Sequence, residues 1–443
     1  MRPPTRGACP GISQPMPTGD GLLARLMPSA PIPLDAFDAL CDASQTHGNG
    51  IVEVTQRGSL QIRGLSPASA PVFARTAFTL GLAAEERPPI LTSPLMGLDA
   101  QECLDLHPLV AALRKDLTNH PAFASLGPKV SVVIDGGGAL HLDNVPGDLR
   151  LQADTASRLH VSIAGTGASA TGLGWVEPHH ALEVIVHVLG SIANRGTSAR
   201  ARDLANRADA HALRATLAGV LSDEPPPAPR PPAEPIGSHR LNNGKAAFGV
   251  ALAFGYTEAG VLKRIAHAAA RCGATSIQPA PGRALLTIGL TAAATTEFAA
   301  CAAAGGMVVR PDDARRFVVA CAGAPACGSA LLSTRQLAPA IALAAKPFLD
   351  GSLTIHVSGC AKGCAHPGAA ALTLIGPDRL VVQGRAGDMP HGTTSAATFI
   401  AGLPRLHSER QRSHAGQERS AETVSRLGPI GVLAVMDGEA VHD

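Results

Sequence analysis

Aromatic residues are scarce in this chain, which has one tryptophan, one tyrosine and 3% aromatic residues in all. Proteins that bind single-stranded nucleic acids stack bases on aromatic side chains, and few are available here. The formal net charge is +2 and charged residues make up 16% of the chain, so the composition indicates no strongly basic surface for a phosphate backbone. These shortages exclude nucleic acid as the expected partner.

Long apolar runs are missing as well. No stretch of about 18 apolar residues suggests a membrane span, and residues 1–20 are rich in Pro and Gly without the apolar core of a secretory signal. No G-x-G-x-x-G motif follows an expected strand, so neither a flavin nor NAD is expected to bind this chain. Nine cysteines without a signal peptide fit reduced thiols. We therefore expect a cytoplasmic protein with no membrane partner.

A proline-rich linker divides the chain into two nearly equal halves. Residues 222–235 read Ser-Asp-Glu-Pro-Pro-Pro-Ala-Pro-Arg-Pro-Pro-Ala-Glu-Pro, a composition that favours an extended spacer. The 443 residues are 45% hydrophobic, enough for about two to four compact domains. The linker therefore predicts a chain built from two units of similar size.

The two halves begin with similar patterns of predicted elements. Each starts with a strand, a helix and two further strands, and each carries an arginine just before its last strand, Arg57 and Arg283. The expected elements are 21–26, 34–46, 50–55 and 60–65 in the first half, and 247–252, 257–272, 276–279 and 284–290 in the second. Later strands are expected at 130–134, 139–142 and 149–152. This repetition predicts an α+β fold with two small units paired about a pseudo-twofold axis.

Four cysteines in the second half indicate redox chemistry. They occur as Cys321-x5-Cys327 and Cys360-x3-Cys364, and an expected strand and turn precede each pair. Four thiolates in two close pairs suit a 4Fe-4S cluster, whereas zinc sites usually have tighter pairs mixed with histidine. A helix is expected to begin at Cys327 and to continue through Leu332.

The motifs Ala-Cys-Ala-Gly-Ala-Pro-Ala-Cys-Gly and Ser-Gly-Cys-Ala-Lys-Gly-Cys-Ala-His-Pro resemble those of the sirohaem sulfite and nitrite reductase superfamily. Together with residues 7–28, they are most similar to its precorrin-3B synthase family. This resemblance implies a duplicated architecture of two ferredoxin-like units and two larger α/β lobes. The expected segments are a first ferredoxin-like half-domain (1–68), a first lobe (87–221), the linker (222–235), a second half-domain (240–295), a cluster-binding lobe (310–410) and a C-terminal tail (411–443).

The resemblance also implies basic residues that hold the carboxylates of a tetrapyrrole. Arginine suits this task because its guanidinium binds a carboxylate through two hydrogen bonds. Where the superfamily has a second lysine after the one matched by Lys129, this chain has Ser131, so a sirohaem-like set of contacts is incomplete. The candidate substrate-binding residues are Arg57, Arg87, Lys129, Arg283 and Arg63.

A mononuclear non-haem iron is a second cofactor that the family resemblance implies. Such iron favours two histidines and one carboxylate. His179, Glu183 and His187 share one helix face, but positions eight apart lie about 12 Å apart along a helix, so at most Glu183 and one histidine could bind one ion. His366, close to Cys364, is more consistent with a structural role. The sequence does not identify the iron ligands or a catalytic residue.

Three functions agree with these motifs. The family resemblance implies an oxygen- and NADH-dependent monooxygenase that hydroxylates precorrin-3A at C20 and forms a lactone in aerobic cobalamin biosynthesis. Its 4Fe-4S cluster would carry electrons from a separate NADH-linked donor. The first alternative is a sulfite or nitrite reductase with sirohaem and the same cluster. The second, a simple electron carrier, leaves two duplicated halves without a task.

Overall fold

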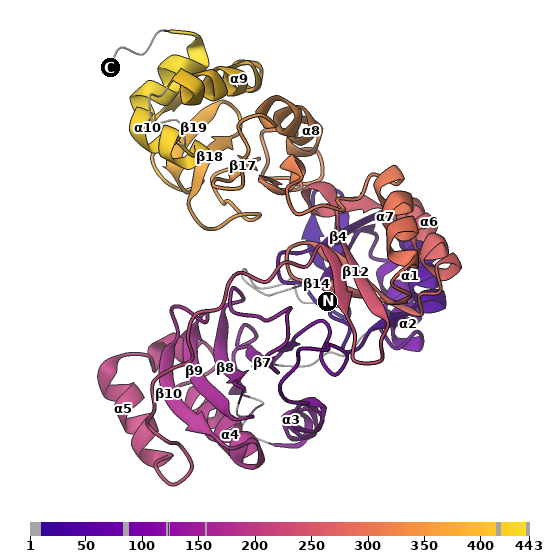
Figure 1. The fold of residues 1–443 in the computed structure, drawn as a ribbon, viewed down its shortest axis with the longest axis vertical. Coiled ribbons are helices and arrows are strands. Elements are labelled where there is room, and N and C mark those ends of the chain that lie inside the picture. Colours follow the sequence, from indigo (N-terminus) through magenta and orange to yellow (C-terminus); the bar gives the residue numbers. More distant parts are fainter. Residues whose placement is uncertain are drawn as a thin grey trace.

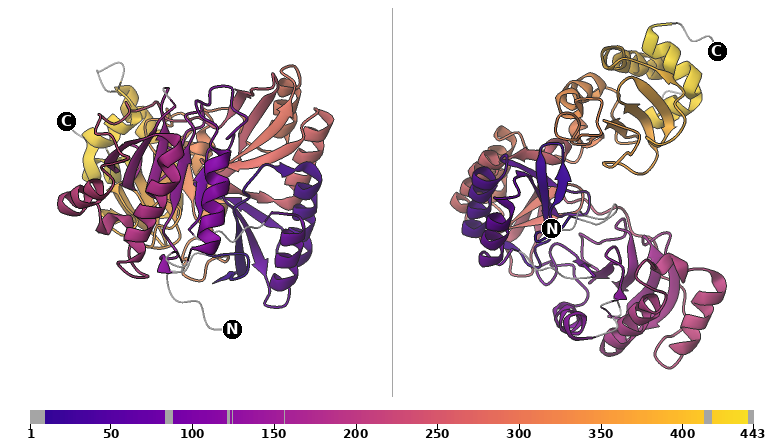
Figure 2. Two further views of the ribbon diagram at one scale, coloured as in Figure 1. Left: turned by 90° about the horizontal axis from the view of Figure 1, so that it is seen from below. Right: turned by 180° about the vertical axis from the view of Figure 1, so that it is seen from behind.

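The protein consists of a central body and two lobes that extend from it toward opposite ends of the molecule (Figures 1 and 2). The computed structural model describes residues 10–82, 88–120, 123, 125–155, 157–412 and 418–439. Segments from both halves of the chain form the central body, while each lobe comes from one half (Figure 1). No helix in these ranges is long and apolar enough to cross a membrane.

Two five-stranded sheets form the central body, and each half of the chain lends one strand to the other half's sheet. β3 pairs with β14 through Ile32 and Ile277, and β13 pairs with β4 through Thr257 and Val52. In spatial order, the first sheet contains β1 (Met16–Thr18), β2 (Gly21–Leu26), β5 (Leu60–Leu65), β4 (Ile51–Val54) and β13 (Tyr256–Glu258). The second contains β11 (Gly237–Arg240), β12 (Ala246–Ala251), β15 (Ala284–Leu290), β14 (Ser276–Ala280) and β3 (Ile32–Pro33).

A single hydrophobic core joins the two halves of the central body. Phe37 and Phe73 from the first half lie in the same cluster as Phe298 from the second, and each is at most 1% exposed. Burial of such apolar surface is the main favourable term in folding. The helices are α1 (Leu34–His47), α2 (Ala70–Thr79), α6 (Ala259–Arg271) and α7 (Ala294–Ala304). The shared core explains why the two halves form one body.

The two lobes repeat one sheet topology. In each, three neighbouring strands run parallel and the remaining pairs are antiparallel. The first sheet contains β10 (Thr171–Val176), β9 (Leu159–Gly165), β8 (Gly147–Ala153), β7 (Val132–Asp135) and β6 (Ile90–Thr92). The second contains β16 (Val318–Ala320), β17 (Ile355–Ser358), β18 (Ala370–Ile375), β19 (Arg379–Gly384) and β20 (Gly392–Thr393). This repetition agrees with a duplicated architecture.

Helices cover the lobe sheets. The first lobe contains α3 (His107–Asn119), α4 (Ala181–Ala193) and α5 (Arg207–Thr216). The second contains α8 (Thr334–Ala345), α9 (Ala396–Arg412) and α10 (Ser420–Asp437), and α10 packs along α9. Short 3₁₀ helices occur at Pro178–His180, Ala201–Asp203, Ala253–Gly255 and Ala314–Arg316.

Two predicted elements, a strand and a helix, are absent from the described residues. In both segments, backbone N–H groups donate to side chains or to another loop instead of forming regular secondary structure. Residues 139–142 form a loop rather than a strand, since Asp99 accepts the N–H of Ala139 at 2.7 Å and Asp135 that of Leu142 at 3.3 Å. No helix begins at Cys327. The following residues form turns, and the N–H of Leu331 is donated to the Gly359 carbonyl at 2.7 Å, in the other cysteine loop.

A buried histidine in the first lobe predicts a pH-dependent stability. His160 is 7% exposed and meets Trp175 edge to face at 5.2 Å, and burial, with Arg214 nearby, lowers its pKa to about 4. As the pH decreases below 6.5, His160 is protonated in the unfolded chain but stays neutral in the folded one. The free energy of unfolding therefore decreases as the pH decreases. We expect a loss of about 2 kcal/mol between pH 7 and pH 5 that His160→Gln lacks. Urea unfolding followed by Trp175 fluorescence measures it, and equal pH slopes in both proteins would contradict it.

Candidate functional site

The four cysteines predicted to bind a cluster lie at one edge of the second lobe's sheet. Cys321 follows β16 and Cys360 lies two residues past β17, and these strands are parallel neighbours with Ala320 opposite Val357. The carboxyl ends of parallel strands meet at the same edge, which brings both cysteine loops together. All four thiols are free, and each is at least partly accessible.

The two cysteine loops contact each other directly. The N–H of Gly359 is donated to Cys321 Sγ at 3.2 Å, and a Cβ at position 359 would lie 2.5 Å from that of Ala330. Burial raises the pKa of Cys364, and the thiols of Cys360, Cys321 and Cys327 raise it further. The other three thiols thus lie close enough to Cys364 to disfavour its ionisation, and a cationic partner among them would remove this cost. This donor set fits a 4Fe-4S cluster.

The four predicted substrate-binding residues that the structure describes lie in different surroundings. Arg63 is 3% exposed, and its Nε and Nη2 donate to Asp20 and to the Ala326 carbonyl instead of facing an open site. Arg283 lies under the second cysteine loop, where its Nη2 is 3.3 Å from the Ala365 carbonyl oxygen. Lys129 is exposed in a turn before β7. Arg87 lies outside the described residues.

Arg57 lines a cleft between the central body and the first lobe. The turns that carry Arg57 and Arg283 meet, because Arg57 pairs with Pro281 and the N–H of Gly282 is donated to the Gln56 carbonyl at 3.0 Å. Arg57 thus faces the first lobe, while Arg283 faces the second. Arg114 on α3 also lines the cleft, and none of the described lining residues is acidic. Sequence reasoning missed Arg114, which has no motif around it.

This cleft is too small for a whole macrocycle. It encloses about 80 Å³, well below the roughly 300–1,000 Å³ of typical small-molecule sites. Arg57 and Arg114 both line the cleft, and a guanidinium binds a carboxylate through two hydrogen bonds. The cleft therefore fits one acidic side arm of a larger ligand.

A second missed residue, His356, lies beneath the cysteine loops. It is fully buried on β17, and neither ring nitrogen has a hydrogen-bond partner among the described residues. Its ring meets His366 edge to face at 5.6 Å, and burial lowers its pKa to about 4, helped by His366 and Arg283. His356 is therefore neutral near pH 7. The apolar pattern of its strand gave no sign of this position.

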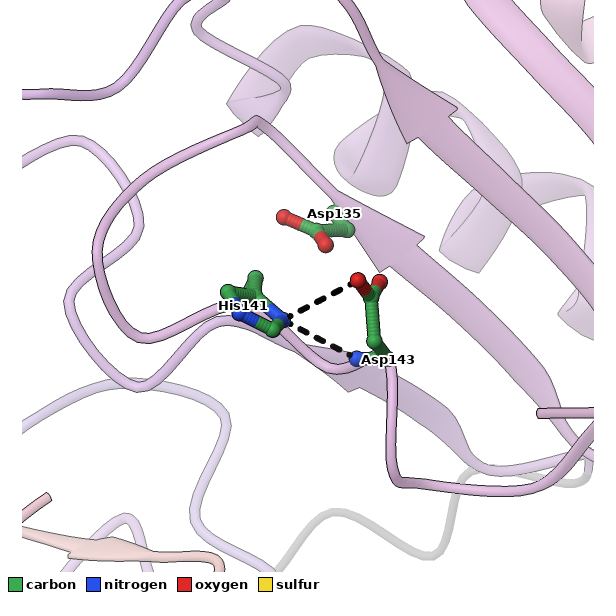
Figure 3. A group of neighbouring side chains, drawn as sticks. All are labelled: Asp135, His141 and Asp143. Carbon is green, nitrogen blue, oxygen red and sulfur yellow. Dashed lines mark hydrogen bonds and ion pairs between the residues drawn. The ribbon is translucent and has the colours of Figure 1, made fainter. Parts of the chain in front are cut away.

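Apart from the cysteines, Asp135, His141 and Asp143 form the one group of described residues with three potential metal-ligand atoms within 4.8 Å of one another (Figure 3). Arg230 of the linker already occupies it, with Nη2 at 2.5 Å from both carboxylates. His141 Nδ1 accepts the N–H of Asp143 at 3.3 Å, and Nε2 is 2.8 Å from the Pro231 carbonyl oxygen. These partners leave no open position, so the group does not fit a mononuclear iron.

The earlier histidine candidates are also engaged elsewhere. His187 Nε2 is 2.9 Å from the Thr216 hydroxyl, and Glu183 pairs with His180 at 3.3 Å. His366 Nε2 lies 3.1 Å from the Ala369 carbonyl oxygen, in agreement with a structural role. None of these described groups therefore fits a mononuclear iron.

The duplicated lobes, the exchanged strands and the edge of four thiols define a protein with the sulfite and nitrite reductase fold. The nitrite/sulfite reductase ferredoxin-like half domain matches residues 14–76. The structure of the NirA protein of Mycobacterium tuberculosis has a TM-score of 0.75 at 19% identity, covering 93% of this chain and 84% of that chain. The predicted fold class is confirmed.

Sequence relatives identify the family within this fold. A Sinorhizobium protein described as precorrin-3B synthase is 38% identical over 440 residues, 98% of this chain and 95% of its own length. The chain therefore belongs to the precorrin-3B synthase family and is an oxidoreductase. Sulfite reductase (ferredoxin) 2 of Mycolicibacterium paratuberculosis is 26% identical and the ferredoxin–nitrite reductase of Synechococcus elongatus 25%, each over 80% of this chain and 69% and 76% of its own length.

Proposed function

We propose that this chain is a precorrin-3B synthase of aerobic cobalamin biosynthesis, acting on precorrin-3A with oxygen and electrons that originate from NADH. The observation that carries the proposal is the 38% identity to a precorrin-3B synthase over almost the whole of both chains. The reaction would hydroxylate the macrocycle at C20 and close a lactone. The four-cysteine edge supports a redox role within this reaction.

The side chains divide into an electron-transfer side and a substrate side. A 4Fe-4S cluster held by Cys321, Cys327, Cys360 and Cys364 would supply single electrons from a separate NADH-linked donor. Arg57 and Arg283 extend from touching turns toward the first and second lobes. A substrate carrying several carboxylates could be held from both sides by these residues, with Lys129 and Arg87 as further candidates.

The site around Ser131 disfavours the alternative of a sirohaem-dependent sulfite or nitrite reductase. Ser131 is 4% exposed, and its N–H is donated to the buried carboxylate of Asp148 at 3.0 Å. Arg200 pairs with the same carboxylate at 2.7 Å. Position 131 therefore lies beside an ion pair within the protein, and this chain has no lysine there to contact a sirohaem.

One experiment separates the two functions. Anaerobically purified protein is analysed for iron, acid-labile sulfide and absorbance, and then given precorrin-3A, reductant and ¹⁸O₂. An iron–sulfur spectrum without a sirohaem band, together with an ¹⁸O-labelled lactone, is expected. A sirohaem band with reduction of sulfite or nitrite and no oxygenated product would contradict the proposal.

The cleft beside Arg57 predicts a specific binding defect. We expect Arg57→Gln to raise the KM for precorrin-3A about 10- to 100-fold, because one charge-assisted carboxylate contact is worth roughly 1.5–3 kcal/mol. Arg114→Gln should act in the same direction. Lys115→Gln, an exposed neighbour on α3, is the matched control. Steady-state kinetics measure the effect, and an unchanged KM in both arginine variants would remove this cleft from the substrate site.

A further inference from the structure

The turn between β1 and β2 packs directly on the first cysteine loop. The N–H of Gly19 is donated to the Ala326 carbonyl at 3.1 Å. A Cβ at position 19 would lie 2.6 Å from the Gly328 nitrogen and 2.7 Å from the Pro325 carbonyl oxygen. Only glycine permits so close an approach without moving the loop. A turn near the start of the chain therefore supports a loop more than 300 residues away in the sequence.

A buried ion pair lies behind this turn. Arg63 Nε donates to Asp20 Oδ2 at 2.9 Å, and its Nη2 donates to Asp20 Oδ1 at 2.8 Å. The same Nη2 donates to the Ala326 carbonyl at 2.9 Å, one residue before Cys327. The two side chains are 4% and 15% exposed. The guanidinium thus fixes the loop that carries a cluster cysteine and places a cation beside it.

The pair belongs to a wider charged network at the same junction. Glu53 lies 3.5 Å from Arg63 and also pairs with Arg335, which stacks on the Tyr256 ring at 4.3 Å. Such partly buried charges are only weakly screened by salt. Within this network, Arg63 is the cation that donates a hydrogen bond to the Cys327 loop, as Arg283 does to the Cys364 loop.

We propose that Asp20 and Arg63 form a positioning pair for the iron–sulfur cluster: Arg63 holds the Cys327 loop through Ala326 and, as a buried cation, stabilises the reduced cluster. The inference rests on the proposed function, in that the four cysteines bind this cluster. One-electron reduction adds a negative charge to a cluster that four thiolates already make anionic. Cluster potentials follow net charge and nearby hydrogen bonds, so a cation on this side raises the reduction potential and an anion lowers it.

Charge variants of the two residues test the inference because they predict shifts of opposite sign. Arg63→Gln leaves the Asp20 carboxylate uncompensated and is expected to lower the reduction potential. Asp20→Asn keeps an acceptor for Arg63 and removes the negative charge, so it is expected to raise the potential. Arg63→Lys keeps the charge and should stay close to the wild type. Lys263→Gln removes a cation paired with Asp42 on a distant helix and should leave the potential unchanged.

The measurement is a dithionite titration of the full-length holoprotein, followed by electron paramagnetic resonance, with iron and sulfide counted in each variant. Opposite shifts for Arg63→Gln and Asp20→Asn support the inference. Shifts of the same sign, or none, overturn it. If Arg63→Gln does not retain a cluster, Asp20→Asn decides: an upward shift supports the inference, and any other result overturns it. A wild type without any cluster would instead overturn the proposed cofactor, and the inference with it.

Discussion

Replacing Cys360 with alanine is expected to abolish turnover of precorrin-3A and to remove the brown absorbance of the iron–sulfur cluster. Cys360 follows β17, and its loop contacts the Cys321 loop through the N–H of Gly359. Replacing Cys360 therefore removes one of the four ligands from the place where the two loops meet. A 4Fe-4S cluster needs all four thiolates. Cys364→Ala should have the same effect. Absorbance, iron and sulfide content, and product formation measure it.

The matched control is Cys301→Ala, which removes a free, partly accessible thiol on α7 in the central body. This variant should keep both the cluster and the activity. Full activity of Cys360→Ala without a cluster would contradict the electron-transfer role. Loss of the cluster in Cys301→Ala would mean that cluster binding does not depend specifically on the four cysteines at this edge of the sheet.

Replacing Arg230 with alanine is expected to destabilise the first lobe by about 3 kcal/mol, the lower end of the cost of breaking a buried ion pair from one side. Arg230 compensates the fully buried carboxylate of Asp135 and that of Asp143, and its own side chain is 22% exposed. Trp175, the one tryptophan of the chain, donates to the Pro225 carbonyl of the same linker at 2.9 Å. Its fluorescence during urea unfolding therefore reports on this lobe.

The same variant predicts a pH dependence. Burial would raise the pKa of Asp143, but the hydrogen bonds and charge of Arg230 bring it below its usual value. The ion pair thus stabilises the protein above the ordinary carboxyl pKa and is lost as the pH falls through the lowered one. The difference between wild type and Arg230→Ala should narrow in acid. Arg310→Ala, which breaks an exposed pair with Asp312, should change little, and an equal effect of both variants would contradict the prediction.

Local patterns in the sequence predicted most of the elements that carry the site. The strand over 21–26 and the strand over 60–65 have the predicted bounds, and the strands before both cysteine pairs are present. These segments follow the two-residue period of strands or lie between clear turn signals. Each cysteine pair follows a strand, and because β16 and β17 are parallel neighbours, the two cysteine loops lie side by side.

The contacts between distant segments could not be predicted in this way. Arg63 reaches Ala326 across 263 residues and Arg230 reaches Asp135 across 95, and no local period specifies such partners. The proline-rich linker was expected to be a spacer, yet its arginine neutralises two carboxylates of the first lobe. The strand expected at 139–142 was wrong for a related reason, since Asp99 and Asp135 accept backbone N–H groups of this loop.

The exchange of β3 and β13 also determines when, during synthesis of the chain, the central body can fold. The first sheet lacks β13 until the second half has been synthesised, because Val52 pairs with Thr257, and β3 lacks its partner β14 until then, because Ile32 pairs with Ile277. A break within 222–235 would leave two fragments that each expose an unpaired sheet edge and part of a shared apolar core. Co-expressed fragments should therefore reassociate, whereas either one alone should aggregate. The central body forms only after most of the chain has left the ribosome.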